Sequence, residues 1–360
     1  MQLVNRTPLT AAANFSRDPH DEQLRVLMIT AKATFSFDAR GHVQLDTQQP
    51  YPLFPTQMQT ELGLLPRDDL PGLRGELEVI LLGNAHAPAG KPIAQRSVSL
   101  RVGSVLHELE VFGDRTWLTH EEISAPELFS ALPLTYARAY GGSFDVLIDA
   151  DSKLRISDQT NSEGLGFDLE HAMRGFGEAL RAPEGYPKLP GYIRQLPNVE
   201  HPERLISQWS DAPLPAGWAT LAFDSGIRSR WVFDRIAAER PISQDEVIAH
   251  AYQQAHPDWV IPLPPKLPIV EMKGVVPFET ATFLLPDLQP VADVLHGTTV
   301  NAHALAPRML VLLPEELRFY MVYQCVLKLP YVAGKERGVR LRIEHGWTPG
   351  NDAEAVEHQA

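Results

Sequence analysis

The sequence predicts a mainly β fold, α+β at most, with antiparallel sheets in a β-sandwich-like body, proline-rich connections and a few short helices. Three observations lead to this prediction. Apolar and polar residues alternate in several short segments, as in half-buried strands. The 31 prolines favour short strands and extended connections, because proline lacks an amide hydrogen. Only one segment shows clear helical periodicity.

The first predicted strand lies before the turn at Gly41. Its polar positions include Thr30, Lys32 and Thr34. The alternation predicts a strand with one buried face and one polar face. The apolar positions are Leu27, Ile29, Ala31, Ala33, Phe35 and Phe37.

Residues 98–111 predict a β-hairpin. Gly103 and Ser104 can form a two-residue turn, and glycine in the first turn position favours type II′. In that register His107 stands opposite Leu100 on the apolar side. We interpret this histidine as a packed side chain rather than a ligand.

The C-terminal half predicts a second hairpin and one helix. Residues 311–313 and 317–323 form the hairpin around Pro314, and residues 339–343 form a last strand. The helix covers about residues 243–256, where Ser243 and Glu246 match a capping box. It is expected to end at His256, because the residue before proline disfavours helix.

We predict three portions of the chain. Residues 1–225 form a β-rich family domain, and residues 226–348 form a β-rich portion with the helix, which can pack with the first as one unit. Residues 349–360 are expected to be a disordered polar tail.

Composition points to an acidic cytoplasmic protein. Lysine and arginine total 32 against 45 aspartates and glutamates, a formal net charge of −13. This charge argues against nucleic acid and anionic membranes as partners. The single cysteine, Cys325, cannot form an internal disulfide. The first residues lack a signal-peptide pattern, so we expect a cytoplasmic location.

No catalytic or metal-binding motif is found. The thirteen histidines show no spacing typical of a metal site, and no nucleophile motif is present. We therefore expect a protein that is not an enzyme and needs no cofactor or metal. Two alternatives stay open: a hydrolase with an unrecognised histidine or carboxylate site, and a carbohydrate-binding β module that stacks sugars on aromatic rings.

The stretch from residue 113 to 142 is the densest in recognition-type side chains. Arginine forks bind carboxylates, and tryptophan and tyrosine provide large contact area at low entropic cost. The same side chains could instead be core residues. As candidate partner-binding residues we take Arg115, Trp117, Tyr136, Arg138 and Tyr140.

A set of motifs in fixed order resembles one known family. It begins with Asn5-Arg6-Thr7-Pro8 and the strand at 31–35, continues with residues 113–117, 133–142 and 161–166, which include Tyr136 and Asn161, and ends with residues 196–200 and 215–218. Together these motifs resemble the domain-of-unknown-function 2169 family (DUF2169), over about residues 1–225. The signature positions that we assign to structure are Asn5, Thr7, Pro8, Gly113, Asp114, Gly141, Gly142, Asn161, Gly164 and Gly166.

The resemblance implies a role in bacterial type VI secretion. Members of that family are effector adaptors or chaperones in the cytoplasm of Gram-negative bacteria. They bind a cognate toxin effector and help to load it onto the VgrG or PAAR spike. The resemblance therefore implies an effector and a spike component as partners, and no enzymatic activity.

Overall fold

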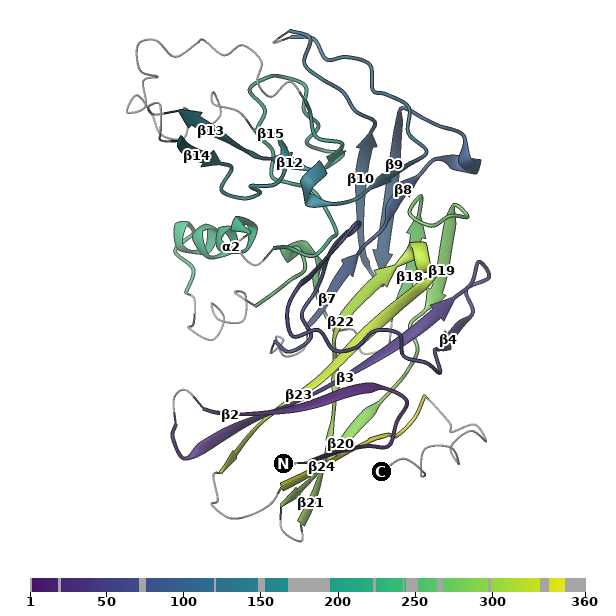
Figure 1. Ribbon diagram of the computed structural model, residues 1–360, viewed down its shortest axis with the longest axis vertical. Helices are drawn as coiled ribbons and strands as arrows, with labels where there is room; N and C mark the ends of the chain where they lie inside the picture. Colours follow the sequence, from purple (N-terminus) through teal and green to yellow (C-terminus); the bar gives the residue numbers. More distant parts are fainter. Residues whose placement is uncertain are drawn as a thin grey trace.

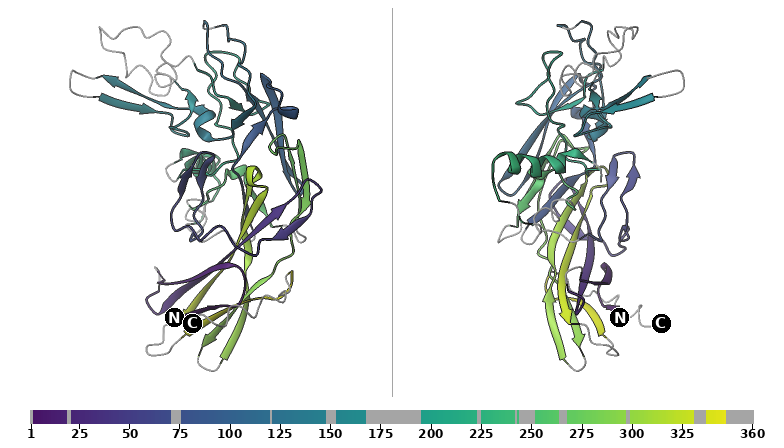
Figure 2. Two further views of the ribbon diagram at one scale, coloured as in Figure 1. Left: turned by 45° about the vertical axis from the view of Figure 1, so that its right-hand side comes forward. Right: turned by 90° about the vertical axis from the view of Figure 1, so that its left-hand side faces the viewer.

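The computed structural model shows an elongated, strand-rich molecule in which three sheets follow one another along the long axis (Figures 1 and 2). The mainly β prediction is confirmed. The structure describes the chain apart from residues 1, 19–20, 71–75, 120, 148–152, 168–194, 223–224, 242, 244–251, 264–267, 297–298, 331–336 and 347–360.

A seven-stranded sheet forms the centre. Its pairings are antiparallel except for β7 with β22, which run parallel. Its central strands are rich in buried Val, Leu, Phe and Tyr side chains, which form the main core. In spatial order the strands are β17 (Val260–Pro262), β7 (Glu76–Leu81), β22 (Ala306–Leu313), β23 (Arg318–Pro330), β3 (Leu24–Phe37) and β2 (Thr10–Arg17), with β4 (Val43–Leu45) beside β3.

A five-stranded sheet contains the first predicted hairpin. Val102 pairs with Val105 and Leu100 with His107, and Gly103 has a positive φ of 62°, so the predicted register and turn position are confirmed. His107 packs on the ring of Trp259 at 4.7 Å between ring centroids. The strands are β16 (Val199–Glu200), β10 (Val105–Phe112), β9 (Gln95–Val102), β18 (Ile269–Lys273) and β19 (Thr280–Leu284).

A four-stranded sheet lies at one end of the molecule (Figure 1). It contains the predicted last strand, which pairs in parallel with the first strand of the chain. Its order is β1 (Gln2–Asn5), β24 (Arg337–Ile343), β20 (Pro290–His296) and β21 (Thr299–Ala304).

Four short strand pairs complete the fold. They lie in the connections between strands of the larger sheets. The pairs are β5 (Met58–Thr60) with β6 (Gly63–Leu65), β8 (Asn84–His86) with β11 (Ala131–Pro133), β12 (Tyr140–Gly141) with β15 (Leu165–Gly166), and β13 (Ser143–Leu147) with β14 (Lys153–Ser157).

The second predicted hairpin is also present. β22 and β23 pair antiparallel, and the 3₁₀ turn η5 (Pro314–Glu316) joins them. The turn closes at Leu317, which has a left-handed backbone with φ 52°.

The polar face of β3 departs from the prediction of one buried face. Thr30, Lys32 and Thr34 are all buried, and Lys32 is fully inaccessible to solvent. Residues 51–70 cover this side of the strand, and Lys32 donates to the carbonyl of Pro52 at 2.8 Å. The strand is therefore buried on both faces, and its lysine is an interior residue.

The helices differ from the prediction. The one α-helix in the described part of the chain is α2 (Gly226–Ala237), which the sequence patterns did not indicate. Most of the predicted helix, residues 244–251, lies outside the described residues, and residues 252–256 are not helical, so no helix reaches His256. The predicted disordered tail also lies outside them. No helix in the described ranges combines the length and apolar character needed to cross a membrane.

Strands from both sides of residue 225 share sheets. β3 pairs with β23, β7 with β22, and β9 with β18. Their side chains contribute to one continuous hydrophobic core.

Candidate functional site

The stretch from residue 113 to 142 is folded inward. Trp117 and Tyr140 lie in a second, smaller core together with Phe167, Leu196 and Ile206. Trp117 makes an edge contact with Trp209, with ring centroids 5.5 Å apart. Burial of these rings stabilises the connections around β12 and β15.

Arg115 is buried against an acidic partner. Its guanidinium forms an ion pair with Glu200 on β16 and lies over the ring of Phe112 at 3.7 Å. Burial raises the pKa of Glu200, and the positive charge of Arg115 offsets part of that rise. The pair joins the start of the stretch to the five-stranded sheet, so Arg115 has a structural role.

Arg138 is the most exposed of the five candidates, with a side chain 37% exposed. It donates to the side-chain oxygen of Asn198 at 2.9 Å and lies 3.6 Å from the carboxylate of Asp114. Asn198, which is fully buried, in turn donates to Asp114 at 2.9 Å. These contacts tie both ends of the stretch to residues 196–200.

The partner-binding role of the five candidates stays a prediction. Arg115, Trp117, Tyr136 and Tyr140 are each at most 9% exposed. Their contacts hold the fold together, and little of them is presented to a partner.

Asn161 fastens its loop to this stretch. Its side-chain amide donates to the carbonyls of Tyr136 at 2.8 Å and Tyr140 at 2.9 Å. Asp158 stabilises the loop from within, because its carboxylate accepts from the amides of Thr160 and Asn161 at 2.8 and 2.9 Å.

Two other signature motifs have clear structural roles. Asn5 accepts hydrogen bonds from the amide and hydroxyl of Thr7 at 3.0 and 2.7 Å, which shapes the turn between β1 and β2. Gly141 has a φ of 140°, and a Cβ atom there would collide with the carbonyl oxygen of Asn161. A side chain at this position would force the two segments apart.

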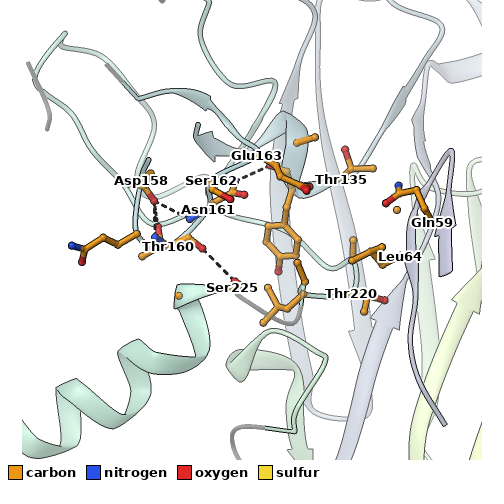
Figure 3. A pocket seen from close by; sticks show the side chains of 18 of the residues that line it. Gln59, Leu64, Thr135, Asp158, Thr160, Asn161, Ser162, Glu163, Thr220 and Ser225 are labelled. Atoms are coloured by element: carbon orange, nitrogen blue, oxygen red, sulfur yellow. Dashed lines mark hydrogen bonds between the residues drawn. The ribbon is translucent and has the colours of Figure 1, made fainter. Parts of the chain in front are cut away.

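Between this loop and the β5–β6 hairpin lies a cavity of about 320 Å³ (Figure 3). Residues 219–222 and the first residue of α2 close its remaining sides. The side chains that define it include Gln59, Glu61, Leu64, Thr135, Tyr136, Asp158, Thr160, Asn161, Ser162, Glu163, Thr220 and Ser225.

The cavity is polar and acidic. Asp158 contributes a carboxylate, and Glu61 and Glu163 add two exposed ones from opposite sides. None of the described residues that line it is lysine, arginine or histidine. Hydroxyl groups also line it beside the apolar side chains of Leu64 and Leu221, and the hydroxyl of Thr220 is buried and has no hydrogen-bond partner among the described residues. Such a lining suits a cationic, hydrogen-bonding group.

A buried glutamine positions the hairpin wall of the cavity. The side chain of Gln254 accepts from the amide of Arg67 at 2.8 Å and donates to its carbonyl at 2.8 Å. The backbone amide of Gln254 donates to the carboxylate of Glu78 on β7 at 2.6 Å. Gln57 donates to the carbonyl of Leu221 at 2.9 Å. The base of the hairpin is thus bonded both to the central sheet and to the opposite cavity wall.

The cavity includes two residues from the motifs that suggested the family, Tyr136 and Asn161. The uncharacterised bacterial protein family DUF2169 matches residues 22–324. The chain belongs to the DUF2169 family. The match extends well beyond residue 225, which was the end of the segment covered by the sequence resemblance. No curated protein and no solved structure matches the chain.

Sequence reasoning did not find most of the cavity. Glu61 lies far along the chain from Thr220 and Ser225, and all three lie in segments without a motif. The one local signal was the loop at 161–166, whose Asn161, Gly164 and Gly166 we assigned to a structural role. Gly166 does have a positive φ of 97°, and the same loop also forms a wall of the cavity.

Proposed function

We propose that this DUF2169 protein is a non-enzymatic adaptor, or effector chaperone, of a type VI secretion system. It binds a cognate toxin effector in the cytoplasm of a Gram-negative bacterium and helps to load it onto the VgrG or PAAR spike. The family membership and the motif pattern of residues 1–225 support this role.

The observation that carries the proposal is the acidic cavity. Glu61, Asp158 and Glu163 supply carboxylates, and no described lining residue offsets them. An arginine or lysine side chain of a partner protein matches this lining in charge and in hydrogen-bonding capacity. The net charge of −13 also favours encounter with a partner that has a basic surface.

The test is co-expression with the effector and the spike protein that neighbouring genes encode. We expect the tagged effector to retain this protein through size-exclusion chromatography, at a fixed stoichiometry. If neither neighbouring product retains it, the adaptor proposal is wrong.

The two alternative functions have separate readouts. Turnover of an ester, glycoside or peptide substrate by the purified protein would favour the hydrolase. Selective binding on a glycan array would favour the carbohydrate-binding module.

A further inference from the structure

The four-stranded sheet has one buried and one exposed face. Val339 and Leu341 of β24 point into the core, where they are at most 1% exposed. The alternate residues Val4 and Arg340, which are register partners on β1 and β24, are both exposed. Because side chains alternate along a strand, these residues define an outer face of the sheet.

Three arginines are neighbours on this outer face. Arg6 follows β1, and its amide donates to the carbonyl of Leu341 at 3.0 Å, so it continues the alternation and lies on the side of Val4. Arg340 and Arg342 are the matching positions of β24. Diagonal neighbours on paired strands are about 7 Å apart, so the three positive charges interact.

Only one of these arginines is neutralised. Arg342 lies 3.2 Å from the carboxylate of Asp293 on β20. Arg6 and Arg340 are exposed and form no ion pair with any carboxylate in the described part of the chain. Asp293 is also the register partner of Arg340, and Glu344 lies 4.0 Å from Arg342, so three arginines stand against two carboxylates and the face keeps an excess of positive charge.

The face also exposes apolar side chains. Val4 on β1 is 42% exposed, and Val300 on the edge strand β21 is 56% exposed. β21 pairs only with β20 among the described strands, and it contains neither proline nor charged residues, the features that commonly protect a sheet edge.

We infer that this outer face, which we call the terminal-sheet face (Val4, Arg6, Val300, Arg340 and Arg342), is a docking surface for an acidic segment of a partner protein. Carboxylates of the segment neutralise Arg6 and Arg340, and its apolar side chains cover Val4 and Val300. Charge complementarity selects an acidic partner, and the interspersed valines favour protein over nucleic acid, which needs a more extensive basic surface.

The inference goes beyond the proposed adaptor role and does not depend on it. The four-stranded sheet that carries the terminal-sheet face lies at one end of the molecule, away from α2, whose first residue lines the cavity (Figure 1). The two sites therefore offer separate surfaces of opposite charge, so one molecule can hold a basic and an acidic partner at the same time.

The test uses a fluorescein-labelled ten-residue peptide of alternating glutamate and valine, titrated with the full chain at 50 mM salt and followed by fluorescence anisotropy. The comparison probes are a lysine–valine peptide of equal length and a single-stranded 20-mer DNA. The test variant is Arg6→Glu/Arg340→Glu. The matched control, Arg40→Glu/Arg240→Glu, changes the charge equally at two exposed positions elsewhere.

We expect the glutamate peptide to bind at least tenfold more tightly than the lysine peptide. The test variant should lose at least tenfold in affinity and the control less than twofold, and 500 mM salt should weaken binding of the wild type. The inference is overturned if the two peptides bind equally, if the two variants behave alike, or if DNA binds this face more tightly than the glutamate peptide. Unchanged circular dichroism of the test variant ensures that a loss reports on the surface.

Discussion

Substitution of Asp68 by alanine is expected to destabilise the protein severely. Asp68 is 1% exposed and lies 2.5 Å from the ammonium group of Lys32, which is fully buried on β3. The remaining neighbours of that ammonium are the carbonyl of Pro52 at 2.8 Å and the rings of Phe54 and Tyr320 at 4.1 and 4.5 Å. Burial lowers the pKa of Lys32 and raises the pKa of Asp68, so each charge depends on the other.

The expected loss of unfolding free energy follows from the buried groups that lose their partner in Asp68→Ala. An ammonium left buried without its counter-ion costs about 3–5 kcal/mol. The amide of Phe54, which donates to Asp68 at 2.7 Å, also loses its acceptor, at about 1–3 kcal/mol. Since domains are stable by about 5–15 kcal/mol in total, Asp68→Ala should remove a large part of the unfolding free energy.

The assay is urea unfolding at pH 7, followed by circular dichroism, for Asp68→Ala and for the double variant Lys32→Met/Asp68→Leu. The double variant should regain most of the loss, because apolar side chains of similar volume leave no buried charge. The reasoning is refuted if Asp68→Ala unfolds within about 1 kcal/mol of the wild type, well below the cost of an unpaired buried charge.

Three further predictions concern single positions. Gly141→Ala should cost about 2 kcal/mol or more in urea unfolding and Gly90→Ala about 1 kcal/mol, because both have positive φ but only Gly141 would also collide with backbone. Burial raises the pKa of Cys325 to about 11, so iodoacetamide at pH 8 should modify it about two orders of magnitude more slowly in the folded protein than in urea. Burial alone would raise the pKa of Glu315, but hydrogen bonds, chiefly from His86, outweigh burial and lower that pKa. The stability advantage of the wild type over Glu315→Gln should therefore be complete above about pH 4.3 and should fall as the pH drops through the lowered pKa of Glu315.

Each of these predictions has a contradicting result. Equal destabilisation by Gly141→Ala and Gly90→Ala would show that the collision of a Cβ atom at Gly141 with the backbone does not affect stability. Equal alkylation rates in folded and unfolded protein would show that Cys325 is accessible. A stability difference for Glu315→Gln that does not change between pH 7 and pH 3 would show that the carboxylate charge contributes nothing.

The sequence predicted those parts of the fold that depend on local patterns. Alternation identified β3, and a glycine-first turn fixed the register of β9 with β10. These signals are local because side-chain parity and turn geometry act over a few residues.

Features that depend on distant segments were missed. The lysine of β3 is buried because residues 51–70 cover it, which alternation alone cannot reveal. α2 begins at Gly226 without a side-chain cap, since the hydroxyl of Ser225 donates to the carbonyl of Thr160 instead. The cavity was missed for the same reason, as its walls come from four separate segments.

The most direct test of the proposed function is calorimetric titration of the purified protein with its neighbouring effector. The cavity variant Glu61→Lys/Glu163→Lys is compared with Glu121→Lys/Glu203→Lys, an equal charge change at exposed positions outside the cavity. We predict that the cavity variant loses at least tenfold in affinity and that the control stays within twofold of the wild type. Equal affinity for all three proteins would contradict a role of the cavity in binding the effector.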